Sequence, residues 1–359
     1  SLQAQTGLDF YTLQRETVDA YGTAFAPGGN LTISEQQVWE SNTKVLLSGT
    51  PQLTDDVSLR LDLGGNLRHR VSEGITVNGG GMITPYFRHI SNLSSRTSSN
   101  DINKQQIRSF FGSAAFDYNE FAFLTVTGRS DWSSTLPTEN IPFFYPSVSG
   151  SFVFTEPFEL PEWFNYGKLR AAWGQIGGDT SPYQLNPTYS FLESHQGQPL
   201  GLISQNSVPN SDLKPTTTTE TEVGLETQFF DDRFGIDLTF YRRNTVDQIL
   251  TATVSGASGY RSRVINSGEI QNSGVELLLS GYPIVGDNFS WEAGLNFGAN
   301  RNEVKSLSEG LDIRLDAANR VGTANIAQIV GEAANVMYGH TYVRDDQGRI
   351  VHDENGVPL

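Results

Sequence analysis

An alternation of apolar and polar residues is the feature that most limits how this chain can fold. It is clearest in residues 120–154, where two alternating stretches flank a polar loop. In the first stretch, Leu124 and Val126 lie on one face and Thr125 and Thr127 on the other, because successive side chains of a strand point in opposite directions. Such a strand has one apolar side and one polar side.

The same type of strand recurs through most of the chain. Besides residues 120–131, strands are predicted at 38–49, 57–70, 105–118, 145–155, 166–177, 217–230, 233–244, 270–282 and 289–301. Two architectures fit this pattern: a water-soluble β-sandwich with a buried apolar face, or a membrane β-barrel whose apolar face meets lipid and whose interior is polar.

The connections between these strands favour the barrel. Short links alternate with long loops, which are predicted at 71–104, 132–144, 178–216 and 245–269. Outer-membrane barrels have short turns on one side of the membrane and elaborated loops on the other, whereas a sandwich has no reason to sort its connections. Aromatic residues also gather beside the short links, as in the interfacial girdles of membrane proteins. The alternative interpretation is aromatic cross-strand pairing in a soluble sheet.

Composition excludes several other classes of protein. A net charge of −16 argues against binding nucleic acid, which requires clustered Lys and Arg. The chain has no cysteine, and its five histidines are scattered without a metal-binding or hydrolase motif. We therefore predict no metal, no cofactor and no catalytic residue, and we expect a protein that is not an enzyme. An outer-membrane enzyme that assembles its site from separate loops remains the alternative.

The two ends of the chain carry less periodicity. Residues 1–36 are predicted to be mostly loop with a short strand near Tyr11, residues 37–301 to be strands with long outer loops, and residues 302–359 to be an outer loop and a hairpin, with a strand near 327–342. Two turn signals, at 346–348 and 355–356, fit turn chemistry better than a calcium loop. Both ends resemble cuts within a longer protein.

Several long blocks together resemble one family, the SusC/RagA branch of TonB-dependent outer-membrane transporters of Bacteroidota. The blocks are TVTGRSDWSSTLP (125–137), FFYPSVSGSFVFTE (143–156), GKLRAAWGQIGGDTSPY (167–183), residues 213–250, residues 255–277 and YGHTYVRDDQGRIVHDENGVPL (338–359). They occur in the order found in the family and cover about two thirds of the chain.

This resemblance implies an all-β fold, an antiparallel transmembrane β-barrel of about 22 strands, of which about ten to twelve lie in this chain. It also implies a plug domain, not expected within these residues, and nutrient uptake energised by the TonB-ExbB-ExbD complex. The implied partners are a SusD-like surface lipoprotein, outer-membrane lipid and an oligosaccharide or peptide substrate. The alternative function is another outer-membrane barrel, namely a passive pore, an adhesin or a barrel enzyme.

Charged residues opposite the apolar face are the candidates for the barrel interior, where they would contact plug, water or substrate. They are Arg129, Asp131, Lys168, Arg170, Glu220, Glu222 and Glu226. The alternative is that these side chains form salt bridges with one another. Candidates for the outer loops are Trp132, Tyr183 and Tyr260.

Overall fold

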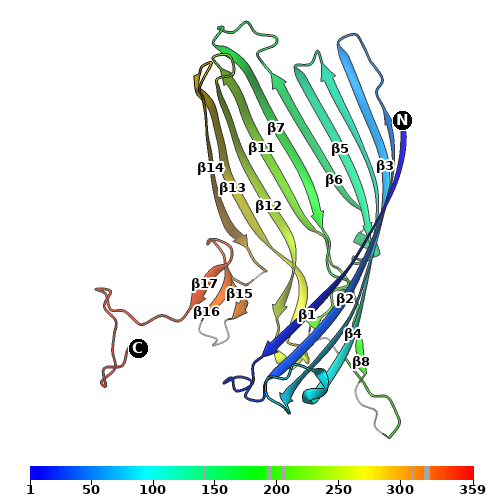
Figure 1. The fold of residues 1–359 in the computed structure, drawn as a ribbon, viewed down its shortest axis with the longest axis vertical. Helices are drawn as coiled ribbons and strands as arrows, with labels where there is room; N and C mark the ends of the chain where they lie inside the picture. Colours follow the sequence, from blue (N-terminus) through cyan, green and yellow to red (C-terminus); the bar gives the residue numbers. More distant parts are fainter. Residues whose placement is uncertain (141, 192–195, 204–206, 309, 319–323) are drawn as a thin grey trace. The chain divides into compact units, whose positions relative to one another are not determined.

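The computed structural model describes residues 1–140, 142–191, 196–203, 207–308, 310–318 and 324–359. Their regular secondary structure is almost entirely β-strand (Figure 1), which confirms the predicted all-β class. They divide into two compact units, one of residues 1–150 with 177–215 and one of residues 151–176 with 216–359. In the described residues, no helix has both the length and the apolar character needed to cross a membrane.

In the first unit the long strands pair in chain order. They are β1 (Leu2–Asp19), β2 (Asn30–Gly49), β3 (Val57–Met82), β4 (Leu93–Tyr118), β5 (Ala122–Ser133) and β6 (Phe143–Val153), whose last residues belong to the second unit. Three short strands follow later in the chain: β8 (Tyr189–Phe191), β9 (Gly201–Ile203) and β10 (Ser207–Val208). The single 3-10 turns η1 (Ile90–Asn92) and η2 (Thr138–Asn140) complete the described elements of this unit.

In the second unit the long strands again pair in chain order. They are β7 (Phe164–Gly178), whose last two residues belong to the first unit, β11 (Thr216–Phe229), β12 (Phe234–Thr253), β13 (Ser262–Val285) and β14 (Ser290–Ser306), with the 3-10 turn η3 (Gly256–Ser258) before β13. A separate three-stranded sheet contains β15 (Ile313–Ala318), β16 (Ala324–Ile329) and β17 (Val336–Gly339).

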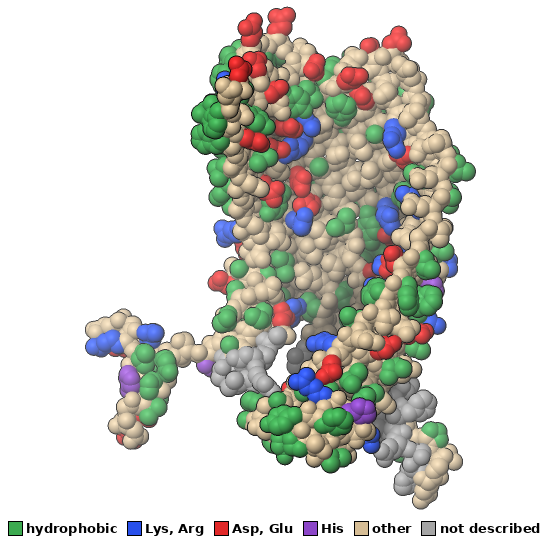
Figure 2. All heavy atoms as spheres, in the orientation of Figure 1, with side chains coloured by type: hydrophobic (Ala, Val, Ile, Leu, Met, Phe, Trp, Pro, Cys, Tyr) green, Lys and Arg blue, Asp and Glu red, His purple; other side chains and the backbone are tan. Residues whose placement is uncertain are grey.

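Strand register places the apolar residues of the second unit on one face. Leu238 pairs with Leu225 on one side and Leu277 on the other, and Leu277 pairs with Phe297. Phe297 is 51% exposed, and no described residue covers this apolar face. The opposite face is charged, and Figure 2 shows Lys, Arg, Asp and Glu side chains gathered on the strand surface turned toward the viewer. The predicted two-sided strands are therefore confirmed.

Aromatic rings cluster at the short turns, as predicted. Trp163 precedes β7, and its ring stacks on those of Phe229 and Phe230 with centroids 5.9 and 6.0 Å apart. Phe164 meets Phe229 edge-on at 4.9 Å. The turn between β11 and β12 is also fixed by polar contacts, because the amide of Asp231 donates to the side chain of Asn165 at 2.8 Å. Such amphipathic clusters suit the boundary between lipid and water.

Two predicted loops are wrong. Most of 71–104 and 245–269 is strand, since β3 runs to Met82, β4 begins at Leu93, β12 runs to Thr253 and β13 begins at Ser262. Alternation fades there because both faces of a strand that projects beyond lipid meet water, while the ladder hydrogen bonds continue. β3 and β4 have 26 residues each, whereas about 9 to 11 residues cross a bilayer. The connection 83–92 is consequently no longer than the turn 154–163, and the predicted sorting of short and long connections is weaker than expected.

The two chain ends also differ from prediction. Residues 1–36 are not mostly loop, because β1 pairs along its whole length with β2. The signal was present, since Leu2, Ala4, Leu8 and Phe10 alternate with polar residues. Beyond β14, the strand predicted near 327–342 is instead divided between β16 and β17 of the separate sheet.

Acidic residues near the C-terminus build turns, as predicted. The carboxylate of Asp345 accepts from the amides of Gln347 and Arg349 at 2.9 Å each, and Asp353 accepts from the amides of Asn355 and Val357 at 2.8 Å each. The Arg349 amide and guanidinium hold the pKa of Asp345 below its usual value, and the Val357 amide does the same for the pKa of Asp353. These oxygens already have partners within their own turns.

Two adjacent leucines of β13 allow a test of which face of the sheet meets lipid and which meets water. Leu277 pairs with Leu238 on the apolar face, and Leu278 pairs with Asp237 on the charged face. Leu277→Arg is expected to impair assembly in the outer membrane, because an arginine facing the lipid midplane costs about 2 to 4 kcal/mol. Leu278→Arg, the matched control, is expected to assemble normally. Folded protein is measured as the heat-modifiable band on a gel.

An arginine at position 277 would also be costly in a dry protein core. Spin labels at the same two positions distinguish a surface that faces lipid from one that is buried in protein. The label at 277 is expected to respond to a lipid-borne relaxation agent, and the label at 278 to a water-soluble one. A label at 277 that neither agent reaches would contradict a lipid-facing surface.

Candidate functional site

Arg170 is the centre of a charged cluster on the polar face of β7, β11 and β12. Its guanidinium extends from β7 across β11 to Asp237 on β12, donating to the two carboxylate oxygens at 2.5 and 3.2 Å. It also donates to the hydroxyl of Thr239 at 2.5 Å. An arginine bound by both oxygens of one carboxylate is a strong and directional pair. The pair therefore joins two strands that are not neighbours.

Glycine on the intervening strand makes this reach possible. Gly224 of β11 lies beneath the Arg170 side chain, and a Cβ at that position would lie 2.4 Å from Arg170 Nε and 2.9 Å from its Cγ. Any larger residue would displace the arginine stem. The glycine is therefore needed for close approach of a side chain.

The other predicted charges of this unit are mostly paired. Lys168 lies 3.6 Å from Glu226, and Arg243 donates to both carboxylate oxygens of Glu220 at 2.8 to 3.0 Å. Glu222 is exposed, and among the described residues no cation lies within ion-pair distance of it. Within the predicted set, Lys168 and Arg170 both lie within ion-pair distance of Glu226, at 3.6 and 3.9 Å, whereas Glu220 pairs with Arg243, a residue outside that set. The alternative of mutual salt bridges therefore holds only for part of the set.

Arg129 and Asp131 form a similar pair in the first unit. Arg129 donates to Asp131 at 2.7 Å and to the buried hydroxyl of Ser109 at 2.7 Å. Its guanidinium carbon lies 5.8 Å from the centre of the Phe111 ring, which in turn lies over Gly64. Both units therefore place a large side chain over a strand glycine: Arg170, itself ion-paired, over Gly224, and Phe111, beneath the ion-paired Arg129, over Gly64.

Asp179, directly after β7, links three segments of the first unit, and we call these contacts the Asp179 latch. Its carboxylate accepts from Gln105 at 2.8 Å, from Ser133 at 2.5 Å and from the hydroxyl of Thr135. The amide of Thr180 donates to it at 2.7 Å. Ser133 and Thr135 are buried, so the latch fixes the connection after β5 against the segment after β7.

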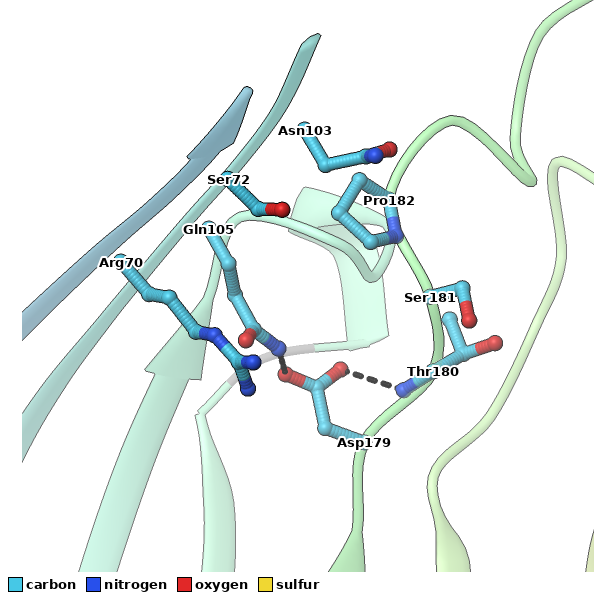
Figure 3. Close-up of a pocket in the computed structure, with 8 residues that line it drawn as sticks. All are labelled: Arg70, Ser72, Asn103, Gln105, Asp179, Thr180, Ser181 and Pro182. Atoms are coloured by element: carbon cyan, nitrogen blue, oxygen red, sulfur yellow. Dashed lines mark hydrogen bonds between the residues drawn. The ribbon is translucent and has the colours of Figure 1, made fainter. Parts of the chain in front are cut away.

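A polar pocket of about 410 Å³, which we call the Arg70 pocket, lies beside the latch (Figure 3). One wall is formed by the polar face of β3 and β4, and the other by the segment that follows β7. Its lining residues are Arg70, Ser72, Asn103, Gln105, Asp179, Thr180, Ser181 and Pro182. Hydroxyl, amide and guanidinium groups dominate, so the pocket suits a polar ligand rather than an apolar one.

Two of the three predicted outer-loop residues lie in connections, and the third lies in a strand. Tyr183 and Tyr260 lie in connections, after β7 and before β13 respectively. Trp132 was wrongly assigned to a loop, because it lies in β5 and pairs with Arg108 of β4. Its indole, 37% exposed, is on the apolar face near the strand end, where an interfacial aromatic residue is expected.

Sequence reasoning missed Asp237, Arg243, Arg70 and Asp179 as site residues. Asp237 and Arg243 occupy polar positions of an alternating strand, so the pattern could have identified them, although not their partners. Asp179 lies in the family block 167–183. In the described part of the chain, no three His, Asp or Glu side chains group as metal ligands.

Comparison with known proteins now decides the family. Residues 1–349 match the family described as "TonB dependent receptor-like, beta-barrel". The chain belongs to this family. TonB-dependent receptor P26 of Formosa agariphila is 30% identical over 327 residues, which are 82% of this chain and 32% of that protein. TonB-dependent receptor SusC of Bacteroides thetaiotaomicron is 27% identical over 269 residues, 69% of this chain and 27% of SusC.

The fold of this TonB-dependent receptor barrel agrees with a solved relative. The structure of the RagAB peptide transporter covers the whole chain with a TM-score of 0.78 at 20% identity, and the chain covers 41% of that protein. The predicted resemblance to the SusC/RagA branch and the placement in the outer membrane are confirmed. The chain spans about a quarter to a third of the length of the curated relatives it matches.

A double-mutant cycle tests the Arg170 pair. Combining Arg170→Met with Asp237→Asn in the full-length receptor is expected to show a coupling of about 1 kcal/mol or more, because charged hydrogen bonds of bidentate geometry exceed ordinary surface pairs. The measurement is urea-induced unfolding in lipid vesicles.

Arg60 and Asp62 of β3 provide the matched control. They pair at 2.9 Å, but the Arg60 side chain is 61% exposed, so their coupling is expected to be close to zero. Equal coupling in the two cycles would contradict a special role for the pair that crosses Gly224.

Proposed function

We propose that this chain forms part of the barrel wall of a TonB-dependent transporter that imports an oligosaccharide or a peptide across the outer membrane. The family match over residues 1–349 is the observation that carries this proposal. Residues 1–359 are proposed to be one continuous portion of the barrel domain. The partners are a SusD-like surface lipoprotein and the TonB-ExbB-ExbD complex, which would supply the energy.

The polar face fits the proposed barrel interior. Its charges are arranged in pairs, so most of the wall presents neutralised groups to passing solute. Arg170, Lys168, Arg129 and their partners are proposed to hold the wall. Glu222, without an ion-pair partner among the described residues, is proposed to face plug or substrate.

A transporter is favoured over the other outer-membrane barrels because the relatives are named as TonB-dependent receptors. An enzyme would need an assembled constellation of reactive side chains, whereas most of the charged residues described above are held in ion pairs. A passive pore differs from a transporter in its energy requirement. This difference makes the two experimentally separable.

Dependence on TonB tests the proposal. Cells that produce the full-length protein together with its proposed lipoprotein partner are expected to accumulate fluorescent oligosaccharides or peptides from a mixed library. Deletion of tonB is expected to reduce accumulation to the level of cells lacking the receptor, because import would require energy from the inner membrane. Uptake that persists without TonB would support a passive pore instead.

Labelling of whole cells tests the orientation of the barrel wall. Cysteines replacing Tyr183 and Tyr260, in connections at one end of the strands, are expected to react with a membrane-impermeant maleimide. Cysteines replacing Asp232 and Asp287, in the short turns at the other end, are expected to react only after the outer membrane is broken. The chain has no native cysteine, so its own residues add no background. The reverse pattern would invert the proposed topology.

A further inference from the structure

The Arg70 pocket is built by strand register. Arg70 of β3 pairs directly with Gln105 of β4, and Ser72 pairs directly with Asn103. Because alternate residues of a strand share one face, these side chains form a square on the polar face of the two strands. Figure 3 shows them facing the segment Asp179–Pro182 across the pocket.

The carboxylate of Asp179, which lines the pocket, already accepts hydrogen bonds from groups of the chain. Asp179 accepts from the side chains of Gln105, Ser133 and Thr135 and from the amide of Thr180. A carboxylate has about four acceptor sites, and four donors meet this one. Asp179 therefore shapes the pocket wall and does not neutralise Arg70 by direct contact.

Arg70, in contrast, has unused donor capacity. The nearby Glu40 receives two hydrogen bonds of 2.8 Å from Arg68, which leaves Arg70 Nε 4.0 Å from that carboxylate. The other polar contact of the Arg70 guanidinium within the described chain is a long one of 3.5 Å to the hydroxyl of Tyr11. A guanidinium carries five N–H donors, and the Arg70 side chain is 41% exposed.

The pocket lies in the half of β3 nearer its end at Met82. Arg70 lies thirteen residues along β3 from its start at Val57, on the face opposite Leu67 and Val71, whereas about 9 to 11 residues cross the bilayer. Counted from Val57, the pocket therefore lies beyond the number of residues needed to cross a bilayer, toward the end of β3 that continues into the connection 83–92.

We propose that the Arg70 pocket is a binding subsite for a carboxylate carried by the transported substrate, either the acid group of a sugar or the C-terminus of a peptide. Arg70 binds the carboxylate, and Ser72, Asn103, Thr180 and Ser181 bind neighbouring hydroxyl or amide groups. A chain with a net charge of −16 repels anions unless a guanidinium is offered locally. The proposal rests on the function proposed above and specifies its substrate chemistry.

Binding to the purified full-length receptor in lipid nanodiscs tests the subsite. The probes are fluorescent digalacturonate with its neutral counterpart digalactose, and a short peptide with either a free or an amidated C-terminus. Wild-type protein is expected to prefer at least one carboxylate probe over its neutral counterpart. Arg70→Gln is expected to reduce that preference by about tenfold or more, since a charged hydrogen bond contributes about 1.5 to 3 kcal/mol.

Three variants control this measurement. Arg88→Gln removes an exposed cation that lies in the connection 83–92 and outside the pocket lining, and it is expected to keep the preference. Arg70→Lys is expected to retain part of it, because the charge remains while the planar donor pair is lost. Asn103→Asp, nearly unchanged in shape, is expected to abolish the preference by placing a negative charge in the pocket. Heat modifiability on a gel confirms that each variant is folded.

Each outcome bears on the proposal. Preference for only the sugar acid or only the peptide acid supports it and identifies the source of the carboxylate. An undiminished preference in folded Arg70→Gln overturns it, as does wild-type protein that binds acidic and neutral probes equally or binds neither. TonB-dependent uptake by the same wild-type protein is measured separately, so failure of the subsite leaves the transport function standing.

Discussion

The requirement that every backbone N–H and C=O be paired within lipid determines the rest of this structure. A strand that crosses a bilayer finds no water to bond, so each ladder must continue without interruption across the apolar region. β3 keeps one register with β2 over residues 61–80 and with β4 over residues 57–80, without a shift in either ladder. Register then fixes the faces, because a shift by one residue would exchange the lipid side and the polar side.

Packing on the polar face follows from the same ladder. Without a buried core beneath them, long polar side chains have only neighbouring strands on which to lie. Gly64 and Gly224 provide the space, one under Phe111 and the other under Arg170. The ion pairs Arg129–Asp131 and Arg170–Asp237 then hold the long side chains in place. Strand glycines and paired charges therefore act together to stiffen a wall that is only one sheet thick.

Much of the fold could be predicted from the sequence, and the part that could not has a physical reason. Where one face meets lipid, alternation is obligatory, and the strands around Leu124, Leu238 and Leu295 were identified correctly. Where strands project into water, the polar residues around Asn78 and Thr97 satisfy both faces, so only the ladder marks them as strand. The same limit applies to the charged site. Alternation predicts the face on which a charge such as Arg170 lies. Its partner Asp237 lies two strands away, and only the strand register brings the two together.

The Asp179 latch gives a physical reason why two of the sequence blocks that carry the family resemblance occur together in one chain. Ser133 and Thr135 belong to the block 125–137, and Asp179 belongs to the block 167–183, and their side chains meet. Neither block has a complete set of hydrogen bonds alone, because the buried hydroxyls need the carboxylate and the carboxylate needs the hydroxyls. A change in one block is therefore costly without the other. The latch also holds Gln105 and Thr180 on opposite sides of the Arg70 pocket, so the joint that stabilises the end of the strands also sets the width of the pocket.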